Sequence, residues 1–168
     1  MESPKEKLDE VQERYANGEA RPLGGYVRTL STFGAITSLL TAAVARRGGP
    51  PEQIRTRDLA LASIASFRLA RVVTHASVTA PLRAPFTRFL GPAGPGEVRE
   101  DVQDAEGGHR HAVGELVTCP YCFGMWTATA FTFGMVLSPR WTRLAASVLT
   151  VSAGSDALQK AYEDLQAR

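Results

Sequence analysis

The longest stretch without a charged side chain, Leu116–Pro139, is the feature that most constrains how this chain can fold. It holds twenty-four residues, and Phe, Met, Val and Leu are frequent in its second half. As one helix it would rise about 36 Å, whereas the hydrocarbon core of a bilayer is about 30 Å thick. Core helices of soluble proteins rarely need such a length. The run therefore predicts a helix that crosses a membrane.

Three further stretches have a similar character. Thr29–Ala45 contains seventeen residues without a charge and lies between Arg28 and Arg46. A second apolar helix is expected to begin near Asp58, and the last stretch is Leu144–Ser155. Together with the longest run, these stretches predict an all-α fold, a small membrane-embedded helical bundle of about four apolar helices.

Outside these stretches the chain is more polar. Ser3 and Glu6 have the spacing of a capping box, so residues 1–21 are predicted to begin with a short amphipathic surface helix. After Asp156 the last apolar stretch is expected to continue as an amphipathic C-terminal helix. The Gly- and Pro-rich segment 91–114 is predicted to be one long polar loop. The length of 168 residues fits a single membrane-embedded domain, 1–168.

Composition limits the possible partners. The formal net charge is +2, and the basic residues are scattered along the chain, which argues against a nucleic-acid-binding protein. The mean hydropathy of −0.11 hides a sharp partition between charged and uncharged segments. We therefore expect the lipid bilayer to be the main partner, with other membrane proteins or self-association as further candidates.

One predicted helix carries a polar stripe. Arg68, Arg71 and His75 follow one another at spacings of three and four, which places them on one helical face. A helix surrounded by lipid does not carry two arginines without compensation. The stripe could bind an anionic headgroup or line a polar passage. Alternatively it could form structural ion pairs, and the candidate partners are Asp156, Glu115 and Asp58.

The only two cysteines, Cys119 and Cys122, form a Cys-Pro-Tyr-Cys sequence. Glutaredoxins use this dithiol sequence, and a helix N-terminus would lower the pKa of the first thiol. A second possibility is zinc, with His109 and His111 completing four ligands. A third is that both thiols only pack against their neighbours. Because the sequence shows no βαβ unit around the motif, no catalytic residue and no cofactor is assigned, and zinc stays the possible metal.

Three blocks of sequence resemble a bacterial membrane-protein family catalogued as domain of unknown function thirteen-sixty. They are residues 21–26, residues 66–71 with 80–86, and the most specific block, Gly114–Trp126. The resemblance implies a multi-pass membrane protein without an assigned activity or catalytic residue, and some relatives are linked by name to sporulation. Residues 74–77 depart from the family, in which a charged Lys-Asp or Arg-Asp pair is expected there.

We expect from these patterns an integral membrane protein that serves as an accessory or assembly protein of the bacterial envelope rather than as an enzyme. A membrane thiol-disulfide oxidoreductase or metal-binding protein, and a small transporter or channel subunit, are the alternatives. A multi-pass location in the cell membrane is expected, with both termini and the long loop cytoplasmic because this keeps the thiols reduced. Arginines flank both sides of the predicted bundle: Arg46, Arg47, Arg55 and Arg57 on one, and Arg83, Arg88 and Arg110 on the other.

Overall fold

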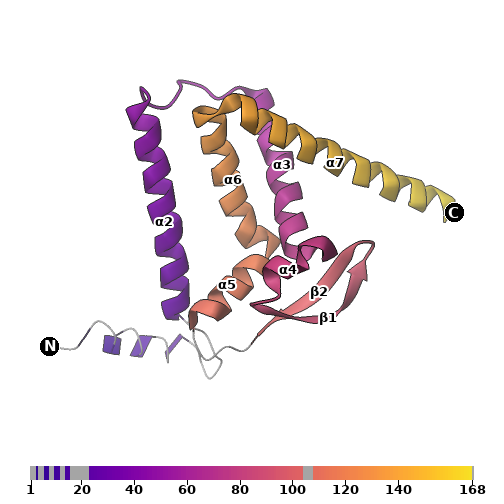
Figure 1. The fold of residues 1–168 in the computed structure, drawn as a ribbon, viewed down its shortest axis with the longest axis horizontal. Helices are drawn as coiled ribbons and strands as arrows, with labels where there is room; N and C mark the ends of the chain where they lie inside the picture. Colours follow the sequence, from indigo (N-terminus) through magenta and orange to yellow (C-terminus); the bar gives the residue numbers. More distant parts are fainter. Residues whose placement is uncertain are drawn as a thin grey trace.

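The computed structural model describes residues 23–103 and 108–167, together with Ser3, Glu6, Lys7, Glu10, Val11, Arg14 and Tyr15. Figure 1 shows the order of the elements along the chain. The helices are α2 (Leu23–Arg46), α3 (Thr56–His75), α4 (Ala80–Arg83), α5 (Gly108–Thr118), α6 (Pro120–Leu137) and α7 (Pro139–Gln166), with a 3₁₀ turn at Ser77–Thr79. The strands are β1 (Thr87–Gly94) and β2 (Glu97–Val102).

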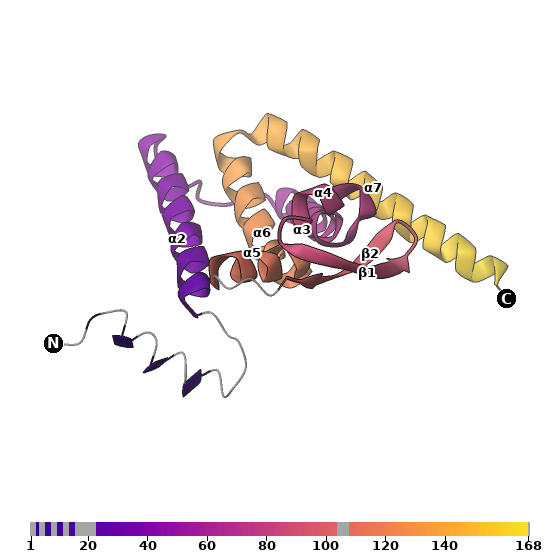
Figure 2. The same ribbon diagram turned by 60° about the horizontal axis from the view of Figure 1, so that its bottom comes forward.

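Helices α2, α6 and α3 run side by side, and α7 crosses the top of this layer and continues beyond it (Figure 1). Helix α5 and the β-hairpin lie together at the opposite end, as both views show (Figure 2). The buried core is small and joins three helices: Ala62 and Ala65 of α3, Phe131 and Met135 of α6, and Ala146 of α7. Alanine at these positions lets the helix backbones approach closely.

The structure corrects the predicted bundle of four apolar helices. Within the described residues, only α2 is long and apolar enough to cross a membrane. The run Leu116–Pro139 is not one helix, because Pro120 starts a new helix after Cys119, whose backbone is extended. Helix α6 is therefore limited to 18 residues. Charged side chains interrupt α3, and they also occupy the second half of α7.

The expected loop at 91–114 is also corrected. Most of this segment belongs to the antiparallel hairpin of β1 and β2 and to α5. The chain turns at Pro95 and Gly96, and the φ of +72° at Gly96 suits a residue without a side chain. A segment rich in Gly, Pro and charged residues usually forms a loop. This one forms a hairpin because Val98, Glu100 and Val102 face inward in alternation with exposed charged residues, and because Glu100 has a buried partner.

The predicted capping box is confirmed. The backbone N–H of Ser3 donates to Glu6 Oε2 at 2.7 Å, and the N–H of Glu6 donates to Ser3 Oγ at 3.2 Å. The rest of the predicted surface helix at 1–21 falls largely outside the described residues. At the other end, the amphipathic continuation after Asp156 is the second half of α7.

Helix α2 is fixed at both ends and largely exposed between them. At its start, Gly25 lies against α5 so closely that a Cβ there would be 1.8 Å from the carbonyl oxygen of Gly108. Just beyond its end, Arg47 Nη1 donates to the carbonyl oxygen of Leu137 at 2.6 Å. Gly25 and Val44 are its only buried residues. The contacts of α2 thus set its position and leave most of its apolar surface uncovered.

Candidate functional site

Cys119 caps the N-terminus of α6. Its Sγ accepts a hydrogen bond from the backbone N–H of Cys122 at 3.2 Å, and both thiols are free. Loss of solvation, followed by the hydrogen bond with Cys119, raises the pKa of the Cys122 thiol to about 11. A thiol with a raised pKa forms little of the thiolate that attacks disulfides. This environment does not favour Cys122 as a redox nucleophile.

The predicted zinc ligands are not gathered into one cluster. Among the described residues, no group of three or more His, Cys, Asp or Glu side chains is placed to hold a metal ion. His109 and His111 lie in the first turn of α5. His111 Nε2 is 3.4 Å from Glu115 Oε1, one turn further along the same helix. The histidines and thiols therefore sit on neighbouring helices without forming a tetrahedral site.

Each residue of the polar stripe of α3 has partners of its own. Arg68 Nη1 lies 2.5 Å from Asp156 Oδ2 on α7, and its Nε donates to Ser152 Oγ at 3.1 Å. This confirms Asp156 as the partner of Arg68 among the three candidates. Arg71 forms two hydrogen bonds with the carboxylate of Glu97, at 2.7 and 2.8 Å. His75 Nδ1 is 2.7 Å from the hydroxyl oxygen of Thr74.

These two arginines line a cleft of about 490 Å³ where α3, the tip of the hairpin and α7 meet. Its charged lining residues are Arg68, Arg71, Lys160, Glu97, Asp156 and Glu163, three of each sign. Both arginines are already bound to carboxylates from other elements. The cleft therefore joins α3 to α7 and to β2 rather than presenting an uncompensated charge to a ligand.

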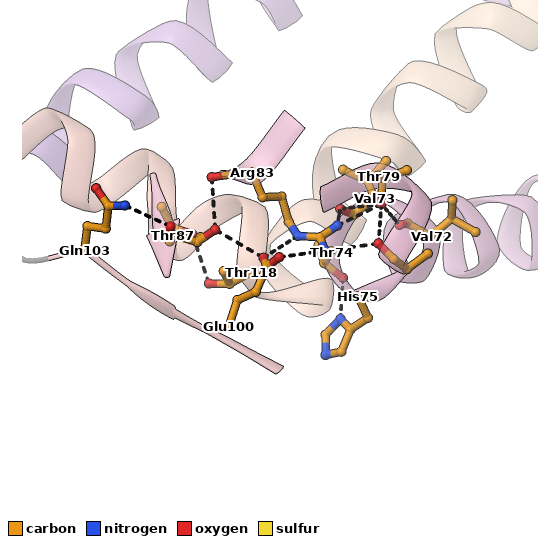
Figure 3. A network of polar contacts seen from close by, with 12 residues as sticks. Val72, Val73, Thr74, His75, Thr79, Arg83, Thr87, Glu100, Gln103 and Thr118 are labelled. Carbon is orange, nitrogen blue, oxygen red and sulfur yellow. Dashed lines mark hydrogen bonds and ion pairs between the residues drawn. The ribbon is translucent and has the colours of Figure 1, made fainter. Parts of the chain in front are cut away.

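A buried polar network beneath the hairpin was not predicted from the sequence (Figure 3). The Arg83 side chain is completely buried, and its Nε lies 2.6 Å from Glu100 Oε2. Its other nitrogens donate to the carbonyl oxygens of Val73, at 2.6 Å, and Ala76, at 3.0 Å. Thr87 Oγ1 also donates to Glu100 Oε2, at 3.2 Å. Arg83 thus satisfies carbonyl groups at the C-terminal end of α3 and attaches the hairpin to it.

The sequence signal for Arg83 was weak. It lies between Pro81 and Pro85, in a segment that reads as a helix terminator, and its partner Glu100 lies in a segment that reads as a polar loop. The local sign was the alternation of Val98, Glu100 and Val102, which puts Glu100 on the inward face of a strand. A carboxylate on that face needs a partner.

A second ion pair closes the opposite end of the helical layer. Arg143 of α7 forms two hydrogen bonds with the carboxylate of Asp58 on α3, at 3.0 and 2.7 Å. The bond with Arg143 lowers the pKa of Asp58 and raises that of the arginine. Asp58 and Arg83 therefore hold the two ends of α3, which as a helix of 20 residues are about 30 Å apart.

An apolar groove of about 470 Å³ lies between α2, α5 and α6. Phe33 of α2 and Trp126 of α6 meet there edge to face, with ring centroids 5.1 Å apart. The groove also contains Leu30, Leu116, Met125 and Cys122. It continues the exposed apolar face of α2 into the body of the protein, which makes this side of the molecule the most suited to an apolar environment.

Comparison with known proteins agrees with the sequence blocks described above. Residues 61–162 match a family model described as "Protein of unknown function (DUF1360)". This match confirms the family resemblance and covers most of α3, α4, the hairpin, α5, α6 and most of α7, whereas the block at 21–26 lies outside it. No curated protein and no solved structure matches the chain.

Proposed function

The chain belongs to the DUF1360 family, and we propose that it is an accessory protein of the bacterial cell envelope, anchored in the membrane by α2. One observation carries this proposal: a helix of 24 residues, apolar enough to cross a bilayer, has almost all of its side chains uncovered. A helix of this length spans about 36 Å, which exceeds a hydrocarbon core of about 30 Å.

The exposure of α2 is unusual for a chain surrounded by water. Leu30 and Leu39 are 70% and 71% exposed, and Val27 and Ile36 are also uncovered. Arg28, in the second turn of α2, and Arg46, its last residue, flank the seventeen uncharged residues, and their long side chains can reach the headgroups. Contiguous apolar surface of this kind is covered in a working protein by lipid or by another protein. Lipid is the cover that a helix of membrane length requires.

The accessory role is supported by how the charged groups are used. The buried or half-buried arginines Arg68, Arg83 and Arg143 each bind a carboxylate from a different element. Such pairs fix the relative positions of helices and strands. Their partners are supplied by the chain itself, so these charged groups stabilise the fold and are not left over for a substrate.

Orientation forms a further part of this proposal. The start of α2 lies against α5, so α5, the start of α6 and the hairpin are at the same end of the protein as the first turn of α2 (Figure 1). We place this end in the cytoplasm, where free thiols persist. Cys119 should then resist a membrane-impermeant maleimide on intact cells and react after the cells are permeabilised. Labelling in intact cells would instead place this end of the protein outside the cytoplasm.

The anchor is tested by alkaline carbonate extraction of membranes that contain the full chain. The native protein should stay in the pellet. Replacing Ile36 and Leu39 by lysine should release it, since each lysine at the centre of a membrane helix costs about 2.5 to 3.5 kcal/mol. Val78→Lys is the matched control, because Val78 is 85% exposed and lies outside α2. A native protein that extracts into the supernatant and is monodisperse without detergent would contradict the anchor.

A further inference from the structure

Helix α7 carries a continuous exposed apolar seam along nearly its whole length. One row of the seam consists of Leu144, Val151, Leu158 and Leu165, each seven residues after the last. A second row, at intermediate positions, consists of Trp141, Val148, Ser155 and Tyr162. All eight residues are exposed, and the seven large apolar ones are between 57% and 74% exposed. We call these eight residues the α7 seam.

The spacing of the α7 seam is that of a coiled coil. Its members alternate at intervals of three and four, an average of 3.5 residues, from Trp141 to Leu165. This period keeps a narrow row of side chains facing one partner helix as the two helices wind around each other. A helix that only meets a broad apolar environment needs a wider apolar face and no such period.

The seam faces away from the rest of the protein. The opposite side of α7 packs on α3: Ala146 is fully buried, Arg143 binds Asp58, and Asp156 binds Arg68. After Asp156, every described residue of α7 is exposed, and the helix extends beyond the helical layer (Figure 2). The attachment of α7 to α3 therefore leaves the seam accessible along both halves of the helix.

The residues that flank the seam allow two copies to approach. In heptad terms the flanking positions hold small or uncharged residues: Ala145, Ser147, Ser152, Gly154, Gln159 and Ala161. Arg140, at the start of the helix, is the one charged flanking residue of α7. The charges of the second half, including Lys160 and Glu163, lie on other faces of the helix. Two identical seams would thus meet without like charges along their edges.

We propose that the α7 seam is an interface at which a second copy of this chain docks, helix against helix. An identical seam on each copy gives the self-complementary contact of a two-fold dimer. Seven large apolar side chains on each side supply an interface on the order of 700 Å², close to the 800 Å² per partner of a typical stable complex. The seam keeps one phase from the uncharged first half of α7 into its charged second half, as a single partner helix along its whole length requires. The inference goes beyond the membrane anchor and does not depend on it.

The experiment measures the protein mass of the purified full chain across a dilution series, with the detergent contribution subtracted. The native protein should have twice the monomer mass of 18.1 kDa. Leu158→Lys should raise the dimer dissociation constant at least about a hundredfold, because two buried leucines are lost per dimer. Ala157→Lys is the control: it places the same charge on the next exposed residue, off the seam. It should leave the dimer intact.

Two results of the mass measurement would overturn the interface, and a quenching experiment supplies a third. One is a native protein with the monomer mass at every concentration, and the other is a Leu158→Lys variant that stays dimeric. A Trp126→Phe background leaves Trp141 as the sole tryptophan. Strong quenching of Trp141 by brominated lipid chains in bilayers would identify lipid as the occupant and reject the second copy. If the protein is soluble without detergent, only the membrane-anchor proposal is contradicted. The dimer is then tested by the same mass measurement in plain buffer.

Discussion

At the residue scale, the structure depends on arginines that are removed from water and then bound. Arg83 is the clearest example, because its guanidinium is completely buried and links the end of α3 to Glu100 of the hairpin. Burying a charge is costly unless partners replace the lost water. Here carboxylate, carbonyl and hydroxyl oxygens all accept hydrogen bonds from the guanidinium. Removal of the arginine would leave the carboxylate of Glu100 buried without its partner, and the protein should lose stability accordingly.

Arg83→Met should therefore lower the free energy of unfolding by about 3 to 5 kcal/mol, the range seen when one partner of a buried ion pair is removed. Arg88→Met on the same hairpin is the matched control. Arg88 is exposed and lies 3.9 Å from Asp101, so its loss should change stability by less than about 1 kcal/mol. Urea unfolding followed by circular dichroism compares the two. Equal effects would show that the buried pair is not what holds the hairpin.

The thiol of Cys122 gives a prediction in pH. Its pKa is raised from an ordinary 9.0 to about 11, so the thiolate is depleted about a hundredfold at pH 8. Alkylation by iodoacetamide should be slow at pH 8 and should accelerate about tenfold per pH unit until the pH approaches 11. Mass spectrometry of a Cys119→Ser variant would follow Cys122 alone. Because Cys119 is one cause of the shift, this variant should react somewhat faster than native Cys122. Rapid alkylation of the native protein at pH 7 would contradict the raised pKa.

At the element scale, the helices are placed by a few close contacts, and the approach of α2 to α5 is the tightest. Gly25→Ala would put a methyl group where the carbonyl oxygen of Gly108 lies, so α2 and α5 must separate. We expect a loss of about 1 to 3 kcal/mol, the usual cost of overpacking. Gly34→Ala is the control in the same helix, because its Cβ meets nothing within 4 Å, and it should be neutral or slightly stabilising. Thermal melting in one detergent measures both. A Gly25→Ala variant as stable as native would show that the contact is loose.

Local patterns predicted some of these elements and failed for others. The spacing of Ser3 and Glu6 predicted the capping box, and the cost of a buried charge predicted that Arg68 needs a carboxylate. The sequence left three candidate partners open, and the fold selects Asp156. The uncharged run ending at Pro139 was misread because lack of charge does not make a single helix: Pro120 begins a new one. The hairpin was missed because its inward Glu100 resembles a surface residue until Arg83 is brought beside it by the fold.

At the scale of the whole molecule, the two ends of the helical layer differ. One end carries the hairpin, α5 and the thiols, and the other carries the pair of Asp58 with Arg143 (Figure 1). Helix α7 packs on this layer mainly through residues 139–156, which include its only buried residue, Ala146, and the Asp156 that binds Arg68. Packing on the layer thus uses the inner face of residues 139–156, whereas the proposed seam runs along the outer face of the whole helix.

Truncation after Ala157 separates packing on the layer from dimerisation. Every described residue it removes is exposed, whereas Ala146 and the bond between Arg68 and Asp156 are kept. At low concentration, where the native chain is monomeric, the truncated chain should therefore melt within a few degrees of it. As concentration rises, the melting temperature of the native chain should increase, because dimerisation stabilises the folded state by mass action. The truncated chain lacks Leu158, Tyr162 and Leu165 and should melt at a constant temperature. If the truncated chain melts far below the native monomer, the end of α7 belongs to the core. If its melting temperature rises with concentration as much as that of the native chain, the interface lies elsewhere.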